Sequence, residues 1–398
     1  MSSLFPRDVH MLASAVTDSI VVWTDSGSRD AAVIFWHWSR EWLSPVVQAI
    51  HDIPDEQVQK NLASLLSNPG CPSGYHGLRN ALVELADRSP GATRELFRLA
   101  WRAESNSRIG YHLGERYQSD QADLLLADLS ARPRPLGSAA DDAPVLIVVP
   151  FRDATGTEHR VRNAVACLRA LTDQSFPREH YAITVVESDR EARWQGVLEP
   201  LCDNYIFARD AGPFNKSWAT NVGVRNTRGQ HEVICVMDAD VLADRHFLSR
   251  NVARFMERGV QSFLPYREMF CLDPPSTSAA IGERLFGAAE SPSESRLRGF
   301  LIRRPPGLCF WIRKTAFDRV AGMDERYAGW GGEDTDFALR VSVKAPLDRW
   351  NDRLIHLHHP PSSAYVNGRT VNHHIPPMSW PAHSDIGRVD RFEAGGVR

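Results

Sequence analysis

The sequence predicts an α/β fold preceded by an all-α region, and three observations carry this prediction. Apolar residues recur at helical spacing in the first part of the chain, strand-like apolar runs alternate with helical patterns in the second, and a Pro- and Arg-rich stretch separates them. A chain of 398 residues has room for two ordinary domains. We expect a helical N-terminal domain over residues 1–139 and an α/β domain with a C-terminal tail over residues 140–398.

The first region shows amphipathic helical patterns. Residues 31–50 and 91–103 carry apolar side chains three and four positions apart, and the triplets Asn68-Pro69-Gly70 and Ser89-Pro90-Gly91 interrupt the pattern. The stretch from Ala131 to Pro144 has no apolar periodicity, so it is predicted to be a linker.

The second region alternates strands and helices, which predicts a mostly parallel sheet. Predicted strands cover residues 145–151, 182–188, 204–208 and 231–241, and predicted helices contain residues 161–171 and 214–229. Ligands of such sheets lie beyond the carboxyl ends of the strands. Polar residues follow three of these ends: Arg152-Asp153, Glu187-Ser188-Asp189 and Asp238-Ala239-Asp240.

Composition and charge exclude several classes of protein. With 43% hydrophobic and 24% charged residues, the chain is neither collagen-like nor disordered. A net charge of −3 argues against nucleic acid as a partner. We find no apolar run long enough for an integral membrane segment and no secretory pattern. The six cysteines show no CxxC spacing, which favours free thiols and a cytoplasmic location.

Asp238 and Asp240 are the first candidate site residues. If the strand stays extended, both carboxylates point the same way and suit Mg²⁺ or Mn²⁺ shared with substrate phosphates. The alternative is a strand end turning into a helix, which Asp240 or Asp244 would cap.

A second candidate is the segment around Trp330, Glu333 and Asp334, where two glycines precede a helix. An aromatic ring beside carboxylates suits a sugar, and a carboxylate can act as a general base. The alternative is that these acids only stabilise a helix N-terminus.

The remaining candidate site residues are two histidines and two basic side chains. In a strand, His356 and His358 would share one face and could bind a metal, or they could form a pH-sensitive surface. Arg152 and Lys216 could contact a phosphate or a base, or be plain surface cations.

Taken together and in order, these segments resemble inverting glycosyltransferases of the GT-A fold, a Rossmann-like nucleotide-diphospho-sugar transferase fold. The similarity is greatest to the family 2-like branch that shares the galactosyltransferase C-terminal Trp-Gly-Gly-Glu-Asp motif. It covers a little over half of the chain, from Pro144 to Pro360. The segments that carry it are VVPFR, FNKSWATNVGVR, VMDADV, GLCFWIRKTAFDRVAGMDERYAGWGGEDTDFALRV and LIHLHHP.

The resemblance implies roles in binding the nucleotide sugar. Arg152, after Pro150, would help to hold the nucleotide, and Glu187 would lie near the uracil or ribose. Lys216 would contact the nucleotide or its phosphates, and Asp238 would bind ribose or assist the metal.

The resemblance also implies the metal site and the catalytic base. Asp240 would bind the metal ion, with His356 completing the site and His358 as the competing choice. Asp334 would be the base. Two acceptor-binding residues would accompany it, Glu333 holding the acceptor and Trp330 stacking on it.

The implied activity is a metal-dependent inverting transfer of a hexose or N-acetylhexosamine from a nucleotide sugar, with a UDP-linked donor favoured and Mn²⁺ or Mg²⁺ as cofactor. The acceptor is open: a glycan, a natural product or a peptide. Two departures matter: the Met-x-x-His pattern of the galactosyltransferases is missing, and the helical N-terminal region has no counterpart. The rival interpretations are a non-catalytic scaffold and a sugar-phosphate nucleotidyltransferase, although only one glycine follows the first strand of the α/β region.

Overall fold

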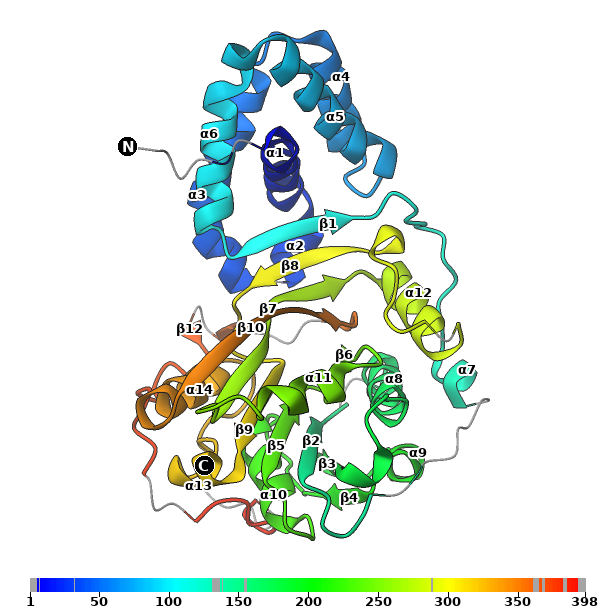
Figure 1. The fold of residues 1–398 in the computed structure, drawn as a ribbon, viewed down its shortest axis with the longest axis vertical. Coiled ribbons are helices and arrows are strands. Elements are labelled where there is room, and N and C mark those ends of the chain that lie inside the picture. Colours follow the sequence, from blue (N-terminus) through cyan, green and yellow to red (C-terminus); the bar gives the residue numbers. More distant parts are fainter. Residues whose placement is uncertain are drawn as a thin grey trace. The chain divides into compact units, whose positions relative to one another are not determined.

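Figure 1 labels the helices and strands of the computed structural model along the chain. The structure describes residues 6, 8–31, 33–130, 137, 139–153, 156–287, 289–360, 365–366, 369–381 and 385–392. Much of the predicted linker between Ala131 and Pro144 therefore lies outside the described residues.

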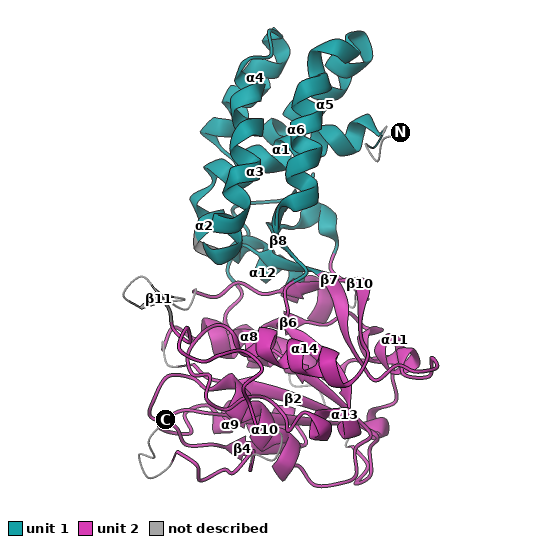
Figure 2. Cartoon of the chain, turned by 90° about the vertical axis from the view of Figure 1, so that its left-hand side faces the viewer, with its two compact units in different colours: residues 1–123, 268–280, 293–304 teal, residues 124–267, 281–292, 305–398 magenta. Residues whose placement is uncertain are grey.

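The chain forms two compact units, coloured separately in Figure 2, and each is built from several segments. The first unit contains residues 1–123, 268–280 and 293–304, and the second contains residues 124–267, 281–292 and 305–398. Our expected division after residue 139 treats each domain as continuous, so it does not include the two later segments of the first unit.

Helices dominate the first unit, and they confirm the predicted helical region. Its N-terminal segment forms α1 (Val9–Thr24), α2 (Ser26–Ala31), α3 (Val33–His51), α4 (Glu56–Ser67), α5 (Pro72–Arg88), α6 (Pro90–Asn106) and strand β1 (Ile109–Leu113). Local chemistry sets the helix starts: Asp55 caps α4 by accepting a hydrogen bond from the Val58 N–H, and a proline opens α5 and α6.

Strand β1, which the sequence pattern did not predict, connects the helices to the later segments of the same unit. It pairs antiparallel with β8 (Arg298–Arg303), which pairs with the second half of β7 (Ser262–Leu272). The apolar core of the unit accordingly combines residues of the helices with Cys271, Phe300 and Ile302. The hydrophobic core of this unit is thus completed only by residues far along the chain.

A twisted sheet with helices forms the second unit, as the sequence predicts. In it the strand order is β7-β9-β5-β2-β3-β4, and β5, β2, β3 and β4 run parallel. The strands not yet given are β2 (Val145–Phe151), β3 (Tyr181–Glu187), β4 (Asn204–Phe207), β5 (Val233–Met237), β6 (Val241–Leu242), β9 (Cys309–Arg313), β10 (Leu347–His356), β11 (Tyr365–Val366) and β12 (Arg369–Thr370). Residues 145–151 form a fully buried strand, because their apolar and β-branched side chains suit a sheet covered on both faces.

The helices of this part of the chain are α7 (Leu126–Ser130), α8 (His159–Thr172), α9 (Gln195–Leu198), α10 (Lys216–Asn226), α11 (Phe247–Arg254), α12 (Pro274–Leu285), α13 (Lys314–Arg319) and α14 (Glu333–Lys344). Helix α10 contacts β2 and β3 closely. A Cβ atom on Gly223 would lie 2.5 Å from Cγ1 of Val148, so glycine is required for this approach. The packing of α10 fixes the position of its first residue, Lys216.

Two predictions about the whole chain can be compared with the structure. All six cysteines are free thiols. Among the described residues, no helix has both the length and the apolar character needed to cross a membrane.

Candidate functional site

The carboxyl ends of the parallel strands bring the predicted polar residues to one edge of the sheet. The register pairs Phe151 with Glu187 across β2 and β3, and Val148 with Val236 across β2 and β5. Arg152, Glu187 and Asp238 follow or end these strands. The edge is thus the place where the sequence analysis expects a ligand.

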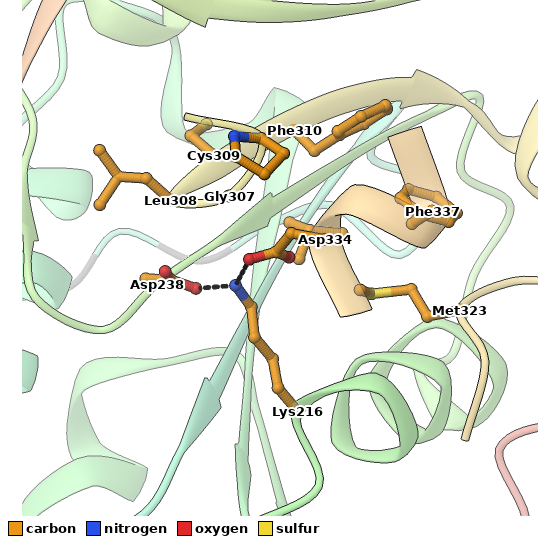
Figure 3. Close-up of a pocket in the computed structure, with 11 residues that line it drawn as sticks. Lys216, Asp238, Gly307, Leu308, Cys309, Phe310, Met323, Asp334 and Phe337 are labelled. Atoms are coloured by element: carbon orange, nitrogen blue, oxygen red, sulfur yellow. Dashed lines mark hydrogen bonds and ion pairs between the residues drawn. The ribbon is translucent and has the colours of Figure 1, made fainter. Parts of the chain in front are cut away.

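Lys216 joins two predicted site residues from different elements. Its Nζ lies 2.6 Å from Oδ1 of Asp238 and 3.0 Å from Oδ2 of Asp334 (Figure 3). Lys216 opens α10, which Asn215 caps by accepting a hydrogen bond from the Trp218 N–H. Asp334 lies in the first turn of α14. The end of β5 and the starts of two helices therefore meet at one ammonium group.

A small recess surrounds this ion-paired group. Its remaining lining is Val236, Pro306, Gly307, Leu308, Cys309, Phe310, Met323 and Phe337. Gly307 is essential to its shape, because a Cβ atom there would lie 2.1 Å from Oδ2 of Asp334. No local sequence pattern indicates Gly307, because its importance depends on a close approach to Asp334, which is distant in the sequence.

Burial and charge perturb the ionisable groups that line this recess, and also Glu333, which precedes Asp334 and does not line it. Burial favours a neutral Lys216, but Asp238 and Asp334 outweigh it and raise the pKa of Lys216 well above its ordinary value. Burial raises the pKa of Asp238 to about 6, with Lys216 opposing the shift. Burial, reinforced by Asp334, raises the pKa of Glu333 to about 7. Such strong perturbation in a recess is typical of functional sites.

A second cluster consists of Asp240, His356 and His359. One donor atom from each residue lies within 4.8 Å of the others, and Nε2 of His359 is 3.0 Å from Oδ2 of Asp240. Strand β10 pairs antiparallel with β6, which places His356 opposite Val241, and the Leu357 N–H donates to the Asp240 carbonyl. This pairing brings the C-terminal histidines to the loop after β5.

The donor set suits a divalent cation. Within the described residues, Oδ1 of Asp240 is buried and accepts no hydrogen bond. One carboxylate and two imidazoles can hold a divalent transition ion, whereas Mg²⁺ prefers oxygen ligands alone. Burial opposes ionisation of Asp240, but His356 and His359 outweigh it and lower its pKa. Burial lowers the pKa of His356 to about 4, so its imidazole is neutral and available as a ligand near neutral pH.

The structure differs from the sequence expectations for this cluster in two ways. Strand β10 ends at His356, so His358 does not share a strand face with it, and the backbone carbonyl of His358 accepts hydrogen bonds from Arg162 and Asn163. His359, which the analysis missed, takes part in the cluster instead. Of the two geometries considered for Asp238 and Asp240, the chain adopts the turn rather than the extended strand, because the Val241 N–H donates to the Asp238 carbonyl.

The predicted nucleotide-binding residues are already engaged with neighbouring groups. Nη1 of Arg152 donates to the Gly212 carbonyl at 2.6 Å, and its Nη2 lies 3.4 Å from Asp189. Glu187 is buried, accepts hydrogen bonds from the hydroxyl of Tyr205 and the N–H of Trp194, and has a pKa raised by its burial. Pro150 is buried within β2.

The predicted acceptor-binding residues differ in exposure. Trp330 is 43% exposed, whereas Glu333 is buried and its Oε2 has no hydrogen-bond partner within the described part of the chain. Asp336, next in this acidic segment, has a structural role, because its oxygens accept from Arg340 Nε at 2.7 Å and from the Met378 N–H at 2.6 Å. At this helix start, Asp336 therefore holds the structure together, whereas Glu333 keeps an oxygen that accepts no hydrogen bond from the described residues.

Two sequence families match the chain, mostly within the second unit. Residues 146–320 match the family Glycosyl transferase family 2, and residues 303–359 match the family described as the N-terminal domain of galactosyltransferase. No curated protein sequence matches the chain.

Several solved structures are similar in part. A mannosyltransferase from Pyrobaculum calidifontis, solved with GDP-Man and Mn²⁺, is 15% identical over 58% of this chain and 62% of its own, with a TM-score of 0.36. Residues 1–349 of S. aureus TarS are 13% identical over 54% of this chain and 60% of that one, with a TM-score of 0.38. The catalytic domain of Drosophila β1,4-galactosyltransferase 7, in complex with xylobiose, is 17% identical over 54% and 71%, with a TM-score of 0.29. The chain spans less than two thirds of the length of the first two structures.

Proposed function

We propose that this chain is a glycosyltransferase that transfers a hexose or N-acetylhexosamine from a UDP-linked donor to an acceptor hydroxyl, because residues 146–320 match Glycosyl transferase family 2 and residues 303–359 match the galactosyltransferase domain. We propose that the transfer is metal-dependent and inverts the anomeric configuration. The observation that supports this best is the arrangement after β5, where Asp238 belongs to the ion-paired recess and Asp240 to the cation cluster. The family matches favour a glycosyltransferase over a sugar-phosphate nucleotidyltransferase, and a measurement of turnover distinguishes it from a non-catalytic scaffold of the same fold.

The cation site is assigned to Asp240, His356 and His359. A bound Mn²⁺ would supply Lewis-acid neutralisation of the diphosphate leaving group. Asp240 contributes the negative charge that a cation requires, and the two imidazoles are held close to it by the pairing of β10 with β6.

Asp334 is assigned as the general base. It would accept the proton of the acceptor hydroxyl as that oxygen attacks the anomeric carbon. Lys216 holds one oxygen of this carboxylate at 3.0 Å, which fixes its orientation. Trp330, with its exposed ring, would stack on the acceptor, and Glu333 would accept a hydrogen bond from it.

The nucleotide would be bound at the ends of β2 and β3. Arg152 presents a guanidinium group that suits phosphate, and Glu187 can accept hydrogen bonds from a ribose or base after local rearrangement. Lys216 and Asp238 would face the diphosphate and ribose. A glycan, a natural product or a peptide remains open as acceptor, and the cytoplasmic location stays a prediction.

A donor screen by thermal shift tests the proposal. UDP, GDP and their sugars are added with Mn²⁺, with Mg²⁺ or with EDTA, and a ligand of the folded state raises the melting temperature. We expect a Mn²⁺-dependent rise with UDP or one UDP-sugar. A well-folded sample that responds to no nucleotide contradicts the proposal. Once an acceptor is found, proton NMR of the product must show the β anomer from an α-linked donor.

The variant Asp334→Asn tests the role of Asp334 as general base separately from donor binding. We expect transfer to fall by about 10²- to 10⁴-fold, with the donor-induced thermal shift retained, since the amide cannot take the proton. Asp318→Asn, which changes a half-exposed carboxylate on α13, is the matched control. Transfer by Asp334→Asn at the wild-type rate would rule out Asp334 as the base.

A further inference from the structure

The segment 371–380 follows both sequence ranges that match known families, and it packs against the loop that carries Trp330. Asn372 is the main point of contact. Its side chain is 7% exposed, its Nδ2 donates to the Gly331 carbonyl at 2.8 Å, and its Oδ1 accepts from the Ala328 N–H at 3.3 Å. One amide therefore holds the chain on both sides of Trp330.

The backbone around Trp330 depends on such external support. Gly329, Gly331 and Gly332 have φ values of +76°, +103° and +100°, a region that other residues rarely adopt. Glycine also has the most conformational freedom to lose, so a loop with three of them is costly to order. Trp330 is 43% exposed, so packing of its own side chain only partly fixes it. Its position follows from the hydrogen bonds to the backbone on either side.

The same segment is anchored to its surroundings at a second place. The Met378 N–H donates to Oδ1 of Asp336 at 2.6 Å, and Nε1 of Trp380 donates to the Ala321 carbonyl at 2.9 Å. Arg326 donates to the hydroxyl of Ser379 at 2.8 Å. Asn372 is thus held by a segment that is itself fixed to the start of α14 and to the chain before it.

We propose that Asn372 is a positioning residue for acceptor binding: it orders the glycine-rich turn so that the Trp330 ring is presented in one orientation. This inference rests on the proposed function of Trp330 as the stacking residue of the acceptor site. The side chain of Asn372 forms its hydrogen bonds with Ala328 and Gly331 of the turn, so its contribution is to the acceptor side.

The order of Trp330 can be measured without any acceptor. Trp330 is assigned in the ¹⁹F NMR spectrum of protein labelled with 5-fluorotryptophan by comparison with Trp330→Phe. We expect Asn372→Ala to shift or broaden this resonance and to leave the resonances of distant tryptophans in place. Asn372→Asp is the second variant, in case the alanine variant does not fold. Aspartate has the shape of asparagine and keeps the oxygen that accepts the hydrogen bond from the Ala328 N–H. It loses the N–H group that donates to the Gly331 carbonyl, so it should perturb the same resonance.

His374→Ala is the matched control, because His374 is exposed on the same segment and has no hydrogen bond to the turn. It should leave the Trp330 resonance unchanged. An unchanged Trp330 resonance in a folded Asn372 variant would overturn the proposal.

Kinetics provide the second measurement. Asn372→Asp should raise the acceptor KM by about three- to tenfold, which corresponds to the loss of about one hydrogen bond, while the donor KM changes little. Equal changes in both constants, or none, contradict the inference. If the wild-type protein itself shows no metal-dependent turnover of any nucleotide sugar, the proposed function has failed, and the NMR result still decides whether Asn372 orders the turn.

Discussion

Lys216 forms ion pairs with two carboxylates at once, with its Nζ 2.6 Å from Asp238 and 3.0 Å from Asp334. Its side chain is only 12% exposed, so the ammonium group is largely shielded from water. The residue assigned as the base and the first acid after β5 are therefore held at a fixed separation by a third residue.

Replacing Lys216 by methionine should both destabilise the protein and impair turnover. The change keeps most of the side-chain volume but leaves two largely buried carboxylates facing each other, which costs about 3 kcal/mol. Thermal unfolding and donor turnover measure the two effects. Lys314→Met is the control, because Lys314 forms an exposed pair with Asp318 that contributes about 1 kcal/mol at most. Similar melting temperatures for the two variants would contradict this account.

The three C-terminal histidines should differ in their effect on metal binding. Alanine at His356 or His359 removes one ligand of the cation cluster, and we expect Mn²⁺ affinity to fall by about 10- to 100-fold. His358→Ala should change it little, because the structure places His359 in the cluster instead. The signal of free Mn²⁺ in an EPR titration measures the affinity. A larger loss for His358→Ala than for His359→Ala would reverse the assignment.

Gly307→Ala should slow transfer by displacing the carboxylate of Asp334, although Asp334 itself is unchanged. The added methyl group would lie 2.1 Å from Oδ2 of Asp334, so the carboxylate must move away from Lys216. Displacing a catalytic group by about 1 Å costs roughly 100-fold in rate. Gly282→Ala is the control, because an added Cβ atom meets nothing within 4 Å there. Steady-state transfer rates at saturating donor check the prediction, and wild-type activity in Gly307→Ala would contradict it.

The first unit should lose stability as pH rises towards 7. Burial raises the pKa of Asp18 from 3.8 to about 7, although Tyr75 donates a hydrogen bond to the carboxylate at 2.5 Å and opposes the shift. A carboxyl whose folded pKa lies above its unfolded value stabilises the fold below pH 4, and this contribution is lost between pH 4 and pH 7.

Asp18→Asn removes this dependence, because the amide has no proton to lose and can still accept the hydrogen bond from Tyr75. At pH 8 we expect the variant to be more stable than wild type by about 2 kcal/mol, less than the full shift implies, because the side chain is not completely buried. Calorimetric unfolding at pH 5 and pH 8 measures the difference. Asp52→Asn, at an exposed carboxyl of the same unit, should behave as wild type. A stability gain at pH 5 equal to that at pH 8 would exclude the mechanism.

Local patterns predicted the parallel strands β2, β3, β4 and β5 of the sheet, but not the antiparallel strands β7, β8 and β9. Strand β2 coincides with the apolar run Val145–Phe151, because a continuous β-branched run has few alternatives to a buried strand. The polar residues at the strand ends were also found, since their meeting at one edge follows from parallel topology.

The details of the candidate site depended on contacts that no local pattern contains. Lys216 and Asp334 are 118 positions apart, and their pairing follows from how α10 and α14 are packed. His359 was missed because strand pairing ends at His356 and the irregular chain beyond it has no periodicity to read. The repeated His358-His359 before Pro360 was the only local signal for it.

The first unit is built from three segments that lie far apart in the sequence, and this has a consequence for its folding during synthesis. Residues 1–123 leave the ribosome first, but strand β1 lacks its partner β8 until residue 303 has been made. Until then Phe300 and Ile302 are missing from the core, and the edge of β1 is open to pairing with other chains. The helical segment therefore stays incompletely folded while most of the second unit is synthesised. An expression fragment that ends at residue 139 would remain in that incomplete state.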